Sequence, residues 1–378
     1  TELTRLETEF EEAVLDATDA WSKVLTRAEL AGLPESALAM LAQAAREKGE
    51  KGHVATLKGP VVQAILTHAD HRGLRQALYT AFSTRASDQG PHAGRFDNAV
   101  RIDKIMALRH ESAQLLGFAS AAHVSLDDKM AGTPERVLGF LHELAGRARP
   151  VAERELAELR AFAAAELGLD DLQPWDLAYW AEKMREARLG LSDEILRPYF
   201  PLDAVIDGLF ALLESLYGVR AEVVSDAPVW HESVTAYRLF ETDGEEIGLF
   251  YLDPYAREHK RGGAWMDDGR SRRRVGGSIQ KPVAYLVGNF TPPLAGKPPL
   301  LTHDEVTTLF HEAGHGLHHL LTRVEVAGVS GINGVAWDAV ELPSQFMENF
   351  CYAREQVQRM TRHVERGEVL PDTLLEKI

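Results

Sequence analysis

The feature that most constrains the fold is a long, capped helical segment in the last quarter of the chain. No proline occurs from Thr302 to Arg323, so about five helical turns are available there. Thr302 fits the N-cap position and Glu305 fits the third helical position, which together make a capping box. Leu301 and Val306 occupy the two positions of a hydrophobic staple. The sequence therefore predicts a helix that begins at a defined residue.

Two glycines interrupt this otherwise helix-favouring segment. Gly314 and Gly316 each weaken a helix by roughly 0.5–1 kcal/mol relative to alanine. Two such costs within one turn indicate a packing requirement. We expect another part of the chain to approach the helix backbone closely at this point.

Residues 308–321 of this segment carry four histidines and one glutamate. His311 and His315 are four residues apart and lie on one helix face, where two imidazoles can reach one metal ion. Glu312 projects to the side of that face and can reach a metal-bound water without acting as a ligand. This His-Glu-x-x-His pattern is typical of zinc hydrolases. We expect His318, one turn further on, to support the site or to pack, and His319 to be structural or exposed.

A catalytic zinc site needs a third protein ligand. One class of zinc peptidase uses a histidine six residues after the second ligand, and that position here is Leu321. The remaining candidates are glutamates, of which Glu325 follows the first helix too closely to fold back. Glu341 comes 30 residues after His311, beyond a glycine-containing connection, which leaves room for a reversal and a second helix. We therefore expect Glu341 to be the third ligand rather than Glu348.

Two further acidic residues flank the expected third ligand. Asp338 and Glu348 are predicted to accept hydrogen bonds from a ligand histidine and thereby orient it. An ordinary acidic helix start explains them equally well, and both readings stay open. Pro343 limits where this second helix begins, or kinks it.

The first part of the chain, up to about residue 225, has a helical pattern. The stretch PERVLGFLHELAGRARP carries apolar residues at helical spacing and is expected to end at Pro150. A second segment, rich in Ala, Glu, Leu and Arg, follows from Val151. Helices of this length and frequency predict a mainly α architecture.

The pattern changes near Val229. Ser233–Glu241 and Glu246–Asp253 resemble strands joined by a short turn. A third strand is expected at Pro282–Phe290, where the leading proline favours a strand start or a sheet edge. The glycine- and arginine-rich stretch between them, residues 259–280, is predicted to be a mobile surface loop.

Composition limits the partners. The formal net charge of −16 argues against nucleic acid or an anionic membrane as the main partner. Cys351 is the single cysteine, so no intrachain disulfide can form and a reducing, cytoplasmic setting is expected. No apolar run approaches the roughly 18 residues of a transmembrane helix. The N-terminus lacks both Met and a signal-peptide pattern, and the C-terminus stops within an apparent helix, so we expect a piece of a longer chain.

Several stretches together go beyond a motif. The pair LTHDEVTTLFHEAGHGLHHLL and GVAWDAVELPSQFMENF, supported by STRASDQGPHAGRFDN, YLDPYAREHKRGGAWMDD and QKPVAYLVGNF, closely resembles the thimet oligopeptidase/neurolysin family of zinc metallopeptidases. The resemblance spans essentially the whole chain. It implies one Zn²⁺ per chain held by His311, His315 and Glu341, with Glu312 as the catalytic glutamate.

The resemblance also implies an architecture. The expected fold is mainly α and zincin-like, with two lobes flanking a deep channel and a small sheet beside the zinc-binding helices. Residues 1–225 would form part of the channel wall, residues 226–292 the sheet region, and residues 293–378 the zinc-binding helices. Family members carry a further His/Tyr/Gly-rich segment that contacts the substrate. No such segment occurs before Ile378, so the C-terminal part of this domain is expected to be missing.

The implied function is zinc-dependent hydrolysis of internal bonds in short, unfolded peptides by a cytoplasmic monomer. A zinc-bound water would attack the scissile carbonyl, with Glu312 as general base. A peptidyl-dipeptidase of the same family and a catalytically incomplete peptide-binding fragment remain alternatives. Residues Ala284, Leu286 and Gly288 are predicted to pair with the substrate backbone as part of an added strand. An ordinary sheet strand is the competing interpretation.

Overall fold

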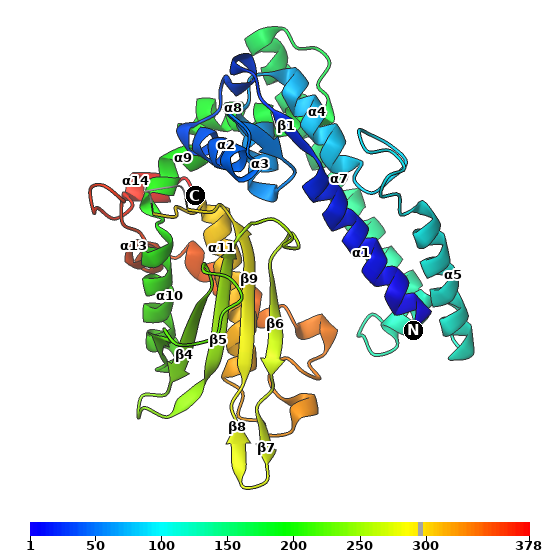
Figure 1. Cartoon of the computed structure of the whole chain (residues 1–378), viewed down its shortest axis with the longest axis vertical. Helices are drawn as coiled ribbons and strands as arrows, with labels where there is room; N and C mark the ends of the chain where they lie inside the picture. Colours follow the sequence, from blue (N-terminus) through cyan, green and yellow to red (C-terminus); the bar gives the residue numbers. More distant parts are fainter. Residues whose placement is uncertain (294–297) are drawn as a thin grey trace. The chain divides into compact units, whose positions relative to one another are not determined.

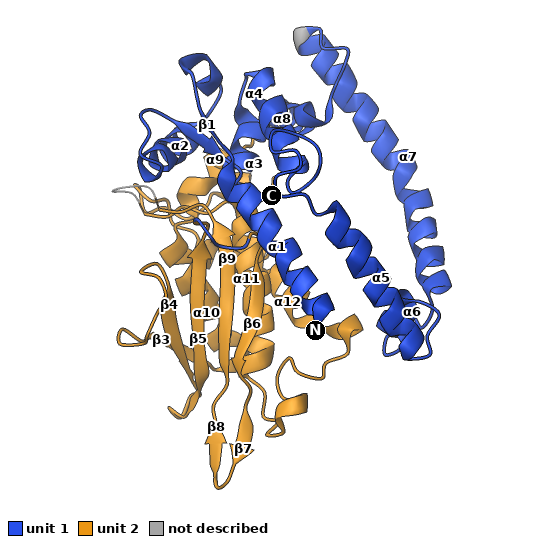
Figure 2. Cartoon of the chain, turned by 45° about the vertical axis from the view of Figure 1, so that its right-hand side comes forward, with its two compact units in different colours: residues 1–190, 258–261 blue, residues 191–257, 262–378 orange. Residues whose placement is uncertain are grey.

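The computed structural model describes residues 1–293 and 298–378, and these divide into two units (Figure 2). Unit 1 comprises residues 1–190 and 258–261, and unit 2 comprises residues 191–257 and 262–378. The first boundary between these units lies near residue 190, and the division at residue 225 stays a prediction. The reason for the boundary near residue 190 is α10 (Leu202–Tyr217), whose buried apolar residues belong to the same core as those of the expected metal-binding helix.

Unit 1 is built mainly from helices. Its elements are α1 (Glu2–Ala20), β1 (Ser22–Val24), α2 (Glu35–Glu47), β2 (Val54–Thr56), α3 (Gly59–His68), α4 (Arg72–Ser83), α5 (Ala99–Leu115), α6 (Ala121–Leu126), α7 (Pro134–Leu167) and α8 (Leu177–Leu189). Ile65, Leu74 and Leu78 are completely buried in its core. The buried carboxylate of Asp176 accepts hydrogen bonds from Arg72 and Arg75, which ties α4 to the segment before α8.

The long helix α7 corrects one expectation. The helix does not end at Pro150 but continues through it to Leu167 and closes on Gly168, which adopts a left-handed conformation with φ of 63°. A proline inside a helix removes one backbone hydrogen bond and strains the preceding turn, but it does not always break the helix. The good helix formers on both sides of Pro150 favour continuation.

Unit 2 combines a mixed sheet with helices. Its helices are α9 (Asp193–Leu196), α10, α11 (His303–Leu320), α12 (Leu342–Glu348), α13 (Arg354–Met360) and α14 (Asp372–Leu375). Its main sheet has the order β3-β4-β5-β9-β6, and its strands are β3 (Arg220–Val223), β4 (Thr235–Phe240), β5 (Glu246–Tyr255), β6 (Trp265–Arg270) and β9 (Val283–Phe290). Figure 1 shows β9 between β5 and β6, with α11 behind the sheet. A mainly helical chain with a small sheet was expected and is confirmed.

The glycine- and arginine-rich stretch is largely not a loop. It contains β6 and the hairpin of β7 (Arg273–Val275) and β8 (Ser278–Gln280). The prediction of a mobile loop over 259–280 is therefore wrong for most of its length. Its composition is typical of a loop, but β6 pairs antiparallel with β9, and this long-range pairing cannot be read from local sequence.

The strand β9 also differs from expectation. It begins directly after Pro282, as predicted, but it is not at an edge, because it pairs parallel with β5 and antiparallel with β6. Ala284, Leu286 and Gly288 are buried in the sheet. The prediction that they pair with a substrate backbone is corrected, since the backbone groups of this strand already have partners on both sides. Among the described residues, β6 is the strand at that end of the sheet.

The glycines of α11 lie where other chain segments pack closely. A Cβ atom on Gly314 would lie 2.5 Å from the carbonyl oxygen of Pro343 and 2.6 Å from Cα of Ser344. A Cβ atom on Gly316 would lie 2.8 Å from Cδ2 of Leu286 in β9. The predicted close approach is confirmed on both sides of the helix.

A further structural finding concerns membranes. Within residues 1–293 and 298–378, no helix combines the length and the apolar character needed to cross a bilayer.

Candidate metal centre

The helix α11 presents the motif as expected. Its N-cap is Thr302, and the capping box with Glu305 is formed in both directions. Leu301 and Val306 are completely buried at the staple positions. The start of the helix is thus determined locally, and this sets the position of every later residue on its faces.

Three side chains converge on one point. Nε2 of His311 lies 3.2 Å from Oε2 of Glu341, and Nε2 of His315 lies 3.1 Å from the same oxygen. The ligand atoms of all three residues lie within 4.8 Å of one another. The structure therefore brings together the two histidines of the motif and the glutamate that spacing favoured.

The donor set and its spacing fit a zinc ion. Two imidazoles and one carboxylate make one of the ligand sets of catalytic zinc sites, which keep a fourth position open. Ligand atoms about 2 Å from a tetrahedral ion lie roughly 3.3 Å apart, close to the separations found here. The Glu341 side chain is 51% exposed, so the point of convergence is accessible from solvent.

The short helix α12 positions Glu341. Glu341 is its N-cap residue, and Pro343 stands in its first turn, where a proline needs no backbone donor. Pro343 thus lies at the beginning of the helix, which is one of the two alternatives that the sequence left open. Trp337–Ala339, just before it, is a separate 3-10 turn.

One supporting residue was missed in the sequence. The hydroxyl of Ser344 donates to Oε2 of Glu341 at 2.8 Å and also to its backbone carbonyl. Burial acts in the opposite direction, but this hydrogen bond and the neighbouring His315 and His311 hold the pKa of Glu341 below its usual value. The spacing of three residues between Glu341 and Ser344 at a helix start was the available signal.

The expected orienting residues have different positions. Oε1 of Glu348 lies 2.6 Å from Nδ1 of His311, the contact that would fix the ring and leave Nε2 for a metal. Asp338 lies exposed in the 3-10 turn before α12, and its proposed role stays a prediction. His319 is completely buried and donates from Nε2 to the carbonyl oxygen of Arg270, so it is structural.

Glu312 lies next to this group in a different environment. Its side chain is buried, and within the described part of the chain its Oε2 has no hydrogen-bond partner. Burial raises its pKa to about 7, with Glu341 adding to the rise and His311 opposing it. Burial also lowers the pKa of His315, which favours the neutral imidazole that a metal requires. A carboxylate poised near neutral pH is suited to exchange protons with water.

Comparison with known proteins agrees with this geometry. A family model described as Peptidase family M3 matches residues 65–378. The chain is 54% identical to oligopeptidase A of Salmonella typhimurium and of Escherichia coli, over 100% of this chain and 56% of either relative. It is 36% identical to a dipeptidyl carboxypeptidase of Escherichia coli, over 100% of this chain and 55% of that relative. The chain thus spans about half the length of the curated relatives it matches, and it belongs to peptidase family M3.

Proposed function

We propose that this chain carries the zinc centre of an oligopeptidase A-like metallopeptidase that hydrolyses internal bonds of short peptides. The observation that carries the proposal is the convergence of His311, His315 and Glu341 within 4.8 Å, beside the buried Glu312. The 54% identity to two proteins named oligopeptidase A supports the substrate class.

The proposed chemistry uses four side chains. His311, His315 and Glu341 would hold zinc, which when bound supplies a Lewis acid that acidifies water and polarises a carbonyl. Glu312 takes a proton from the attacking water and delivers it to the leaving amine. Its pKa of about 7 suits both directions of transfer at neutral pH.

Other side chains support these roles. Glu348 keeps the His311 ring in one orientation, and Ser344 does the same for the Glu341 carboxylate. Both hydrogen bonds fix the geometry of a ligand, and the one from His311 to Glu348 also raises the basicity of the imidazole. The channel that restricts substrates to short unfolded peptides, the monomeric state and the cytoplasmic location are carried over from the family resemblance.

A second candidate is release of dipeptides from a peptide end. The 36% identity to a dipeptidyl carboxypeptidase favours it, but the identity to oligopeptidase A is higher. Both activities would use the same zinc group. Mass spectrometry of the products of an unmodified and a C-terminally amidated peptide distinguishes them, because internal cleavage does not need a free carboxyl end.

The decisive experiment separates metal binding from proton transfer. Metal analysis is expected to find one zinc per chain, lost in His315→Ala and retained in His110→Ala, a matched change of an exposed histidine. Glu312→Gln is expected to retain zinc and to abolish peptide cleavage. Cleavage at the wild-type rate by the Glu312→Gln protein would contradict the proposed mechanism. Zinc binding without cleavage by the wild-type chain would favour the incomplete peptide-binding fragment.

A further inference from the structure

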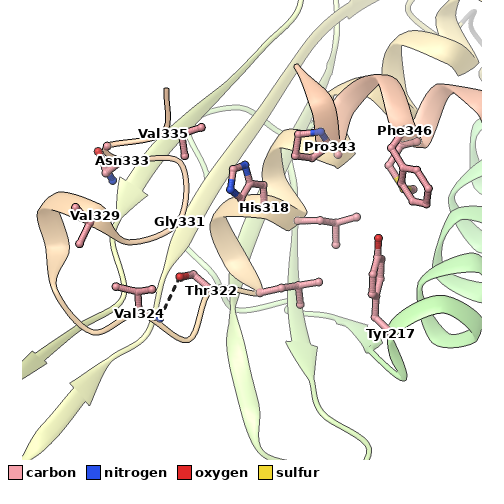
Figure 3. Close-up of a pocket in the computed structure, with 15 residues that line it drawn as sticks. Tyr217, His318, Thr322, Val324, Val329, Gly331, Asn333, Val335, Pro343 and Phe346 are labelled. Carbon is pink, nitrogen blue, oxygen red and sulfur yellow. Dashed lines mark hydrogen bonds between the residues drawn. The ribbon is translucent and has the colours of Figure 1, made fainter. Parts of the chain in front are cut away.

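A pocket lies directly beyond the candidate metal centre along α11. It has a volume of about 480 Å³ and is lined by the end of α11, the connection from Thr322 to Val335, α12 and the end of α10 (Figure 3). This volume falls within the roughly 300–1,000 Å³ range of typical ligand pockets. All of its walls belong to unit 2.

The pocket wall is mostly apolar. Leu317 and Leu321 contribute from α11, Val335 from the connection, and Phe346 and Met347 from α12. A hollow of this kind binds an apolar group by removing its surface from water. Phe346 is 46% exposed, so a bound apolar group can bury further surface of this residue.

The pocket adjoins the metal centre through the chain itself. Gly314 and Pro343 line it, and they stand one residue before His315 and two residues after Glu341. His318 also lines it and lies about one helical turn, or roughly 5 Å, beyond His315 along α11. The pocket therefore begins within about one helical turn of two of the proposed ligands.

One polar atom of a residue in the wall has no partner. Nδ1 of His318 is buried, and no side chain or backbone group of the described residues hydrogen-bonds to it. Burial lowers the pKa of His318, which favours the neutral ring. Figure 3 shows the ring between Gly331 and Pro343 in this view.

We propose that this pocket receives an apolar side chain of the peptide substrate, from a residue close to the cleaved bond. Val335 and Phe346 then act as specificity-determining residues. This inference rests on the proposed peptidase function. It adds a preference for Leu-like or aromatic residues and discrimination against charged ones.

The test measures peptide binding to the zinc-loaded, full 378-residue chain carrying Glu312→Gln, which prevents turnover. The probes are fluorescent ten-residue peptides that differ only by Leu, Ala or Lys at one central position, and binding is followed by anisotropy. Val335→Asp is expected to weaken binding of the Leu peptide at least tenfold and to strengthen binding of the Lys peptide. Val326→Asp is the matched control, since Val326 is 65% exposed in the same connection and outside the pocket. It is expected to leave both affinities within twofold of the parent.

A second variant guards against misfolding of the first. Val335→Phe fills part of the pocket without adding charge, and it is expected to weaken the Leu peptide while leaving the Ala peptide within twofold. The pocket assignment would be overturned if the ratios of affinity for the Leu and Lys peptides, and for the Leu and Ala peptides, were equal in the Val335 and Val326 variants. Absence of any peptide binding would also overturn it. If the wild-type chain cleaves peptides but the Val335 variants leave those affinity ratios unchanged, the peptidase function holds and the pocket assignment is wrong. If binding depends on the pocket but the wild-type chain does not cleave peptides, the pocket assignment holds and the proposed peptidase function of this chain is wrong.

Discussion

At the scale of single residues, the environment of Glu312 decides what its carboxyl group can do. The pKa rises from the ordinary 4.5 to about 7, chiefly because the group is buried. Without metal, the native state therefore keeps a proton that the unfolded chain has released between these pH values. The stability contributed by this proton is fully present below about pH 4.5 and is lost as the pH rises through about 7.

This predicts a pH-dependent stability difference in the metal-free chain. Glu312→Gln removes the ionisation, so its free energy of unfolding should not show this loss. Between pH 4 and pH 8, the free energy of unfolding of the wild type should therefore fall relative to that of the variant by on the order of 3 kcal/mol. Urea unfolding at both pH values measures this, with the exposed Glu355→Gln as control. An identical pH dependence in wild type and Glu312→Gln would mean that the carboxyl group is not buried as described.

The contact between Glu348 and His311 carries a second residue-scale prediction. Removing a group that orients a metal ligand typically lowers metal affinity by about 10–100-fold. Glu348→Ala should therefore weaken zinc binding by about that factor, measured by competition with a chelator. Glu355→Ala removes an exposed glutamate from the next helix and should leave the affinity unchanged. Equal zinc affinity in the two variants would mean that Glu348 does not support the site.

At the scale of elements, the close contact between α11 and α12 holds the third ligand in place. The contact depends on Gly314, because a Cβ atom there would overlap the backbone at Pro343 and Ser344. Since Glu341 directly precedes this part of α12, displacing the helix also displaces the carboxylate. Gly314 thus lowers the stability of the isolated helix, but it allows the close packing that places Glu341 beside the two histidines.

Gly314→Ala should therefore destabilise the chain and lower its zinc affinity. Overpacking of this kind typically costs about 1–3 kcal/mol. Gly146→Ala makes the same change in the middle of α7, where a Cβ atom would meet no atom within 4 Å, and it should stabilise the chain by about 0.5–1 kcal/mol. Thermal unfolding and zinc titration of both variants test this contrast. A neutral or stabilising Gly314→Ala would contradict the packing described.

At the scale of the whole molecule, the candidate chemistry is confined to one of two units. The three proposed ligands, Glu312 and the pocket all belong to unit 2, and each unit has its own buried core. A metal that binds only the folded state stabilises that state by mass action, by about 2.7 kcal/mol at a free concentration one hundred times its dissociation constant. The stabilising effect of zinc should therefore be concentrated in unit 2.

Hydrogen exchange gives the corresponding measurement. Zinc should slow amide exchange in α11 and α12, while exchange in α3 and α4 of unit 1 serves as the internal control. His315→Ala should abolish the protection. Equal protection of both units in the wild-type chain would contradict a metal site confined to unit 2.

Local sequence alone determined the start of α11, the shared face of His311 and His315, and the separate direction of Glu312. Each follows from caps and a period of 3.6 residues, which act over a few positions. The glycines of α11 also indicated close packing against the helix, although the sequence did not show which segments pack there. The family resemblance spans the chain, and the match of residues 65–378 to peptidase family M3 confirmed the family.

Only the tertiary structure decided the remaining features, because each depends on segments far apart in the sequence. The stretch 259–280 has the composition of a loop, and its strand β6 forms through pairing with β9. The same pairing removes β9 from the sheet edge and buries Leu286. The pocket beside His318 and the raised pKa of Glu312 arise only when the elements of unit 2 pack together. Burial and desolvation are properties of the assembled core, and no local pattern of residues encodes them.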